Sequence, residues 1–212
     1  MDLKILEWIN NNIHGSGFVN NLMKYITSLG EAGIIWIVLG IILLIPKKTR
    51  KGGFFLLCGI VATGVVNNLL LKNIINRARP FTHSQSLADF ITGLGLELPD
   101  SPSFPSGHTF SSFCSATILT FAFGKKGAWS FIPASLISLS RVFLCVHYPT
   151  DVLAGAIIGS AVGVGTYYLA RFVIKKLDEF ILNKRQKKVN KSTDIVDKSA
   201  DNSLKQKENL EK

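Results

Sequence analysis

Three short stretches of this sequence combine histidines, an aspartate and fixed cations in a pattern that suits phosphoryl transfer. They lie at residues 72–80, 105–108 and 140–151, each at the end of an apolar run. Placing a charged side chain inside a membrane costs free energy, so charged residues within a largely apolar chain usually have a function. We therefore expect these residues to form a functional site. The residues predicted to carry the chemistry are Lys72, Arg79, Ser106, Gly107, His108, Arg141, His147 and Asp151.

The first stretch brings two cations of different shape together. Lys72 and Arg79 are seven residues apart, which is two turns of a continued helix and predicts that they share one helix face. Arginine offers a planar fork for two phosphate oxygens, and lysine adds a mobile point charge. Pro80 is expected to stop the helix. Arg77 lies off the shared face, and we interpret it as a headgroup or loop contact.

The second stretch has the composition of a helix start that faces an anion. Ser106 is a good residue to begin a helix, and Gly107 lets the backbone approach a ligand. The free N–H groups of a helix start attract anions, and His108 falls in this first turn. Taken alone, the stretch would equally fit a capped helix with an incidental histidine.

In the third stretch, a histidine and a carboxylate bracket a short turn. Asp151 is placed either to cap the following helix or to accept a hydrogen bond from His147. A histidine with one ring nitrogen fixed by a carboxylate presents the other as a nucleophile or base. The simpler interpretation, a capping aspartate beside an interfacial histidine, leaves Arg141 unexplained.

The composition is that of a membrane protein with a polar end. The chain has 212 residues, is 47% hydrophobic and carries a formal net charge of +10. The apolar mass lies in residues 31–174 and the polar excess in 175–212, so the basic charge does not indicate nucleic acid, which we exclude as a partner. The three cysteines lack C-x-x-C spacing and the four histidines form no H-E-x-x-H motif, so we expect neither a metal nor another cofactor.

The apolar runs predict an all-α, polytopic membrane helix bundle. A spanning helix needs about 20 mainly apolar residues. Five segments qualify, at 29–45, 53–71, 107–123, 128–146 and 152–174. Residues 1–28 mix apolar and polar side chains and predict interfacial helices with Trp8 at headgroup level, and a sixth span here is the alternative. The predicted organisation is N-terminal interfacial helices (1–28), a membrane-embedded domain (29–182) and a disordered basic tail (183–212).

Lysine and arginine in the short loops predict the orientation of the chain. Basic residues follow the first, third and fifth spans, at 47–51, 125–126 and 171–176. The positive-inside rule makes these loops and the tail cytoplasmic, and the three charged stretches then converge on the extracytoplasmic face. Residues 81–104, between the first and second stretches, are predicted to form either an interfacial helix or lid near a lipid chain, or a packed connection.

Together the three stretches resemble the signature of a known family. The patterns K-x₆-R-P, P-S-G-H and S-R-x₅-H-x₃-D, in this order, are similar to those of the type 2 phosphatidic acid phosphatase family, whose superfamily also contains vanadium-dependent haloperoxidases and glucose-6-phosphatase. All three match without a departure across residues 72–151. The family's usual long first span is reduced here to the N-terminal interfacial stretch.

The resemblance implies a role for each residue. His147 attacks phosphorus to form a phosphohistidine, and Asp151 orients it. His108 protonates the leaving oxygen and then helps water attack the intermediate. The phosphoryl oxygens are held by Lys72, Arg79, Ser106, the backbone N–H of Gly107, and Arg141.

We therefore expect a metal-independent lipid phosphatase in a bacterial cytoplasmic membrane, surrounded by membrane lipids, with undecaprenyl diphosphate as the preferred substrate. Phosphatidylglycerophosphate or phosphatidic acid is the alternative, because acyl and prenyl chains make the same demand on an apolar groove. A haloperoxidase is disfavoured, because those relatives are soluble. A non-catalytic phospholipid-binding or transport protein would need the same cations but not two histidines and Asp151.

Overall fold

The structure, a computed structural model, describes residues 1–13 and 17–210, with side chains described as far as Gln186. Every element within these residues is helical. In chain order they are α1 (Asp2–Asn12), α2 (Gly17–Leu29), the 3₁₀ turn η1 (Glu31–Gly33), α3 (Ile34–Leu44), α4 (Arg50–Thr63), the π-helix η2 (Gly64–Leu71), α5 (Lys72–Ile75), the 3₁₀ turn η3 (Pro80–Thr82), α6 (Gln85–Gly93), α7 (Gly107–Phe123), α8 (Lys125–Ala128), α9 (Phe131–Phe143) and α10 (Pro149–Leu210).

Helix α7 is the centre of the bundle. It packs against α4 and α9, and glycines on α10 bring a third helix close to it. A Cβ on Gly159 would lie 2.5 Å from the carbonyl oxygen of Phe110, and one on Gly163 would lie 2.7 Å from that of Cys114. Small residues at four-residue spacing let helix backbones approach this closely, as membrane helices require. His108 and Asp151, at the first turns of α7 and α10, are thereby fixed in one region.

The chain bends sharply before α3. Helix α2 and the following η1–α3 segment meet at 43°, and two consecutive residues, Ala32 (φ 48°) and Gly33 (φ 72°), adopt left-handed backbone conformations. Such a conformation is unfavourable for alanine. The sequence predicts one continuous helix over 29–45, and the structure instead has a bend there. The bend brings Glu31 toward α7, which η1 contacts.

The helix that precedes the first charged stretch also departs from a regular α-helix. Thr63 is followed by eight residues of π-helix, Gly64–Leu71, and the helix ends at Ile75, with Asn76 at φ 44°. The prediction that Lys72 and Arg79 share the face of a continued helix is therefore wrong. A left-handed asparagine after the last turn ends a helix, so the stop comes before Pro80.

The connection between α5 and α7 is packed rather than open. Leu87 and Ile91 of α6 are fully buried. Leu87 contacts Leu6 of α1, and Ile91 contacts Leu144 just after α9. Residues 81–104 thus contain a helix, α6, that packs on its neighbours, and Pro99 and Ser101 line a cavity at the start of α7. The structure shows the packing, and the role of a lid near a lipid chain stays a prediction.

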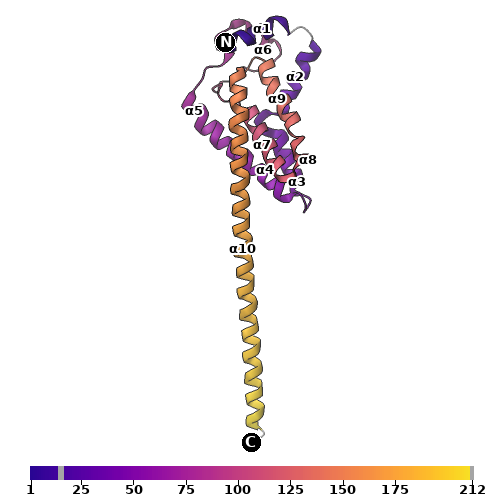
Figure 1. Ribbon diagram of the computed structural model, residues 1–212, viewed down its shortest axis with the longest axis vertical. Coiled ribbons are helices and arrows are strands. Elements are labelled where there is room, and N and C mark those ends of the chain that lie inside the picture. The colour runs from indigo at the N-terminus through magenta and orange to yellow at the C-terminus, as the bar shows by residue number, and fades with distance from the viewer. Residues whose placement is uncertain (14–16, 211–212) are drawn as a thin grey trace. The chain divides into compact units, whose positions relative to one another are not determined.

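The two ends of the first unit differ in charge. Figure 1 shows α1 and α6 at one end of this unit and α3 and α8 at the other. The basic residues of the α3–α4 loop and of α8 lie at the second end, whereas the three charged stretches lie toward the first. Between the ends, α3 and α9 expose large apolar side chains, as lipid-facing helices do: Ile34, Val38, Ile41, Ile42, Ile132, Leu136 and Leu139.

Within the described part of the chain, two helical stretches can cross a membrane by length and composition, Arg50–Thr82 and Pro149–Gln186, and a third can if the bent pair Gly17–Leu29 and Glu31–Leu44 is one span. Helices α7 and α9 have 17 and 13 residues. The apolar helical bundle is as predicted, and five spans remain a prediction.

By contacts the chain forms two compact units, Met1–Leu169 and Ala170–Lys212. In the second unit, Lys175 and Lys176 pair with Glu179 on the helix surface. The segment predicted to be disordered, 183–212, is helical as far as Leu210, and residues 211–212 lie outside the described part. This segment contains neither glycine nor proline, the two residues that most oppose helix formation.

Candidate active site

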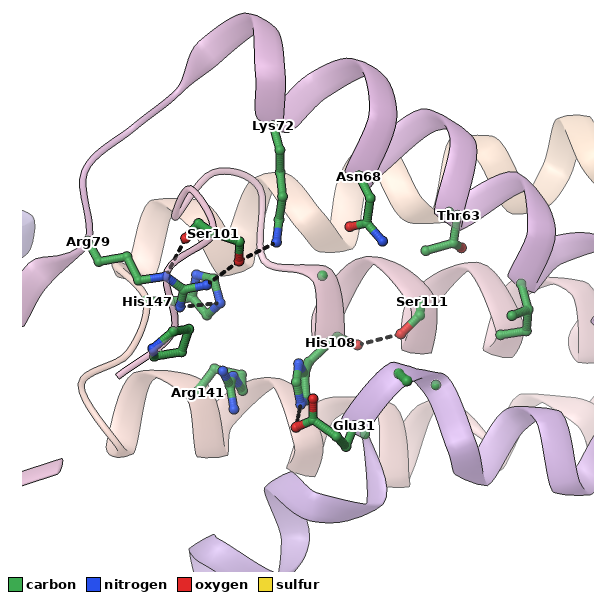
Figure 2. Close-up of a pocket in the computed structure, with 17 residues that line it drawn as sticks. Glu31, Thr63, Asn68, Lys72, Arg79, Ser101, His108, Ser111, Arg141 and His147 are labelled. Atoms are coloured by element: carbon green, nitrogen blue, oxygen red, sulfur yellow. Dashed lines mark hydrogen bonds and ion pairs between the residues drawn. The ribbon is translucent and has the colours of Figure 1, made fainter. Parts of the chain in front are cut away.

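The three charged stretches meet around a cavity of about 400 Å³ in the first unit. Figure 2 shows Lys72 and Asn68 on one side, Arg141 on the opposite side, and His108 on the helix between them. Six of the eight predicted residues line this cavity: Lys72, Arg79, Gly107, His108, Arg141 and His147. The fixed cations give it the charge of an anion site.

A serine, not a shared helix face, brings the two cations of the first stretch together. The hydroxyl of Ser101 accepts a hydrogen bond from Lys72 Nζ (3.2 Å) and from Arg79 Nη2 (3.0 Å). Arg79 also donates to the carbonyl oxygens of Ser101 (2.7 Å) and Val146 (3.0 Å). Because Arg79 is nearly buried, these bonds hold its guanidinium rigidly at the cavity wall.

His147 lies between a carboxylate and a guanidinium. Its Nδ1 is 3.6 Å from Asp151 Oδ2 and 3.4 Å from Ser103 Oγ, and its Nε2 is 3.4 Å from Arg79 Nη1. The Ser103 hydroxyl donates its hydrogen to Asp151 Oδ2. Toward His147 it can therefore act only as an acceptor, which requires a proton on Nδ1. This arrangement favours the tautomer with its lone pair on Nε2, the nitrogen that lies near Arg79 Nη1. Burial lowers the pKa of His147, which keeps the ring neutral and nucleophilic.

Asp151 is held from both sides. Its Oδ2 also accepts from the backbone N–H of Tyr148 (3.0 Å), and its Oδ1 accepts from Arg77 Nη1 (2.6 Å). The guanidinium of Arg77 stacks 3.9 Å above the Tyr148 ring and pairs with Asp2 (3.1 Å). Of the two interpretations of Arg77, headgroup or loop contact, the structure shows contact with the turn into α10, where its fork joins α1 to the carboxylate behind His147.

His108 faces a second carboxylate. Its Nε2 is buried, has no hydrogen bond, and lies 3.6 Å from Glu31 Oε2. Figure 2 shows Glu31 reaching up from η1 to the His108 ring. A Cβ on Gly30 would lie 2.7 Å from His108 Cδ2, so the backbone of this turn packs directly against the ring.

The remaining predicted residues complete one side of the cavity. Arg141 is buried, donates to Thr27 Oγ1 (2.7 Å), and keeps its Nε unpaired. Gly107 lines the cavity, and a Cβ there would lie 4.0 Å from Lys72 Nζ. Ser106 is fully buried one residue before α7, where its hydroxyl accepts from Thr109 (3.2 Å).

Sequence reasoning missed the residues that link the predicted ones. Ser101 and Ser103 lie in a run of serines and prolines directly before the second stretch, which was their only signal. For Glu31 the signal was a carboxylate inside an apolar segment. Among the described residues, no group of three His, Cys, Asp or Glu side chains could hold a metal ion.

A protein-family model matches the part of the chain that carries the site. The model of the PAP2 superfamily matches residues 52–175, more than half of the chain. The chain belongs to the PAP2 superfamily. This match confirms the family that the three sequence patterns indicate. Together with relatives that are named as lipid phosphatases, it confirms the expectation of a membrane lipid phosphatase.

Individual PAP2 proteins are similar over most of the chain. An undecaprenyl-diphosphatase of Sulfolobus acidocaldarius is 34% identical over 144 residues, which cover 67% of this chain and 66% of that protein. Phosphatidylglycerophosphatase B of Bacillus subtilis is 30% identical over 184 residues and 80% of each chain. The crystal structure of a PAP2-type phosphatidylglycerolphosphate phosphatase from Bacillus subtilis superposes with a TM-score of 0.60 at 26% identity, covering 82% of this chain and 85% of that one.

Proposed function

We propose that this PAP2 phosphatase hydrolyses a lipid diphosphate, undecaprenyl diphosphate, by phosphoryl transfer to His147 without a metal ion. One observation carries the proposal. The neutral His147 turns one ring nitrogen to Ser103 and Asp151 and the other to Arg79, at the wall of a cation-lined cavity. An anion site alone has no need of a nucleophile held in this way.

In the first step, Nε2 of His147 attacks the terminal phosphorus and the bond to the leaving oxygen breaks. His108 gives its proton to that oxygen, and the product leaves as the lipid monophosphate. The positive charge that develops on His147 is stabilised by Asp151. In the second step, His108 takes a proton from water, the water oxygen attacks the phosphohistidine, and inorganic phosphate and neutral His147 are restored.

Fixed cations stabilise the transition state of both steps. Lys72, Arg79 and Arg141 line the cavity, where they balance the charge spread over the phosphoryl oxygens. The backbone N–H of Gly107, at the first turn of α7, adds a donor. Loss of one such donor costs about 2.7 to 4 kcal/mol of transition-state stabilisation in comparable sites.

The substrate assignment rests on similarity. The relative at 34% identity is named for undecaprenyl diphosphate. Phosphatidylglycerophosphate is the second candidate, because the relative that matches 80% of this chain is named for it.

We further propose that the site faces the outside of the cytoplasmic membrane. The basic α3–α4 loop and α8 lie at the opposite end of the first unit, and the positive-inside rule makes that end cytoplasmic. The tail would then be cytoplasmic, and α1 and α2 would lie in the outer interface. Cysteine labelling of Lys48→Cys and Asp100→Cys in intact cells tests this orientation, because only the second is expected to react with an impermeant maleimide.

The function is tested by phosphate release from purified protein in detergent. Undecaprenyl diphosphate, phosphatidylglycerophosphate and phosphatidic acid are supplied side by side in EDTA, with His147→Ala as the blank. We expect fastest release from undecaprenyl diphosphate and none from the variant. A faster rate on phosphatidylglycerophosphate would select the second candidate. Binding of all three lipids without release would instead favour a non-catalytic phospholipid-binding or transport protein.

A further inference from the structure

A carboxylate lines the cavity that binds an anion. Glu31 shares this cavity with Lys72, Arg79 and Arg141, and its side chain remains 69% exposed. A negative charge repels a phosphoryl group, so a carboxylate at this position weakens substrate binding. We therefore ask what Glu31 contributes that offsets this weaker binding.

That contribution is visible in the surroundings of His108. The buried Nε2 of His108 has no hydrogen bond, and Glu31 Oε2 is the carboxylate oxygen 3.6 Å away. The charged groups that face His108 are Glu31 from η1, Lys72 from α5 and Arg141 from α9. Burial of the ring, more than any other factor, opposes a positive charge on it, and the two cations oppose it as well; Glu31 is the group that favours it.

The turn that carries Glu31 is shaped to this contact. Gly30 packs against Cδ2 of the His108 ring, where any Cβ would come within 2.7 Å. On the other side of Glu31, Ala32 has φ 48° and Gly33 has φ 72°. A non-glycine residue in the left-handed region costs energy and is kept where the surroundings demand it, often at functional sites. Gly30 and Glu31, which are neighbours in the same turn, thus cover the Cδ2–Nε2 edge of the His108 ring.

We propose that Glu31 is a positioning residue for the general acid of this enzyme. Its carboxylate holds Nε2 of His108 and stabilises the imidazolium, which then gives the proton on the opposite nitrogen, Nδ1, to the leaving oxygen. The proton transfer leaves a neutral imidazole still bound to Glu31, ready to accept a proton from water. The arrangement mirrors the one at His147, where a carboxylate lies near one nitrogen and the other reacts. This inference rests on the proposed function.

The role predicts a dependence on the leaving group. An alkoxide is a poor leaving group and must be protonated as it departs. By contrast p-nitrophenolate, like the lipid monophosphate that leaves from a diphosphate, is a good leaving group and depends much less on a proton, so n-octyl phosphate is the substrate that exposes the general acid. General acid catalysis is typically worth about 10²- to 10⁴-fold. We therefore expect Glu31→Gln to lower kcat/KM for n-octyl phosphate at least about tenfold and that for p-nitrophenyl phosphate less than about threefold. The ratio kcat/KM reports only the steps up to release of the alcohol.

Two further variants make the result specific. Glu97→Gln removes an exposed carboxylate from the connection between α6 and α7, and we expect it to leave both rates unchanged. Glu31→Asp keeps the charge at a shorter reach, and we expect it to recover part of the n-octyl phosphate rate that Glu31→Gln loses.

Three outcomes separate this inference from the proposed function. An equal loss on both substrates, with no recovery in Glu31→Asp, would assign Glu31 a purely structural role and overturn the proposal. A faster reaction in Glu31→Gln on both substrates would show only repulsion of the anion and would also overturn it. If the wild-type protein releases phosphate from neither compound nor from any of the three lipids, the proposed function itself fails.

Discussion

Replacement of Asp151 by asparagine removes a charge from the site while keeping its shape. The amide oxygen can still accept from the Tyr148 N–H and from Ser103, so the turn into α10 is preserved. The NH2 group replaces the oxygen that accepts from Arg77 Nη1, so that bond is lost. The negative charge 3.6 Å from Nδ1 of His147 is lost. At an effective dielectric constant of about 20, a charge pair at this separation is worth about 4 to 5 kcal/mol. Because His147 is neutral at rest and positive in the intermediate, the loss falls on the transition state.

We therefore expect Asp151→Asn to lower kcat about 10³-fold and to change KM less than about threefold. The assay is phosphate release from the best of the three lipids, with single-turnover kinetics to isolate phosphoryl transfer. Asp89→Asn is the matched control, because Asp89 is an exposed carboxylate on α6 that pairs with Gln85. A kcat within tenfold of wild type, or an effect confined to KM, would refute the role assigned to Asp151.

Other parts of the site give separate predictions. Arg77→Gln removes the guanidinium that joins Asp151 to Asp2. We expect kcat to fall about tenfold with an unchanged KM. A rise in KM alone would instead indicate that Arg77 binds the lipid headgroup. Lys72→Ala should lower kcat/KM about 100-fold or more, whereas Lys48→Ala at the opposite end should not change it. Activity should persist in EDTA, and a loss that added Mg²⁺ reverses would contradict the metal-free mechanism.

Most of the helical framework could be predicted because the apolar runs are long and uniform. The bend at η1 and the π-helix η2 could not, because nothing in the local pattern marks them; both segments contact α7 in the fold. A local pattern predicts a regular helix wherever apolar residues continue. The consequence was largest for Lys72 and Arg79, which were expected on one face of a helix that in fact ends at Ile75.

The site residues with distinctive chemistry were named from sequence, and six of them line one cavity. Those that link them were not. Ser101 and Ser103 are ordinary residues of an irregular connection, and only the fold brings them to Arg79 and Asp151. Arg77 was assigned by helical spacing, which does not apply beyond Asn76.

The central claim is that the phosphoryl group passes to His147. The direct measurement is rapid quenching, under alkaline conditions in EDTA, of the enzyme mixed with undecaprenyl diphosphate labelled with ³²P in its terminal phosphate, followed by peptide mapping. The account predicts that label appears on the peptide containing His147 before free phosphate accumulates, and that His147→Ala gives neither labelled peptide nor phosphate. Label on another residue, or multiple turnovers by the variant, would contradict it.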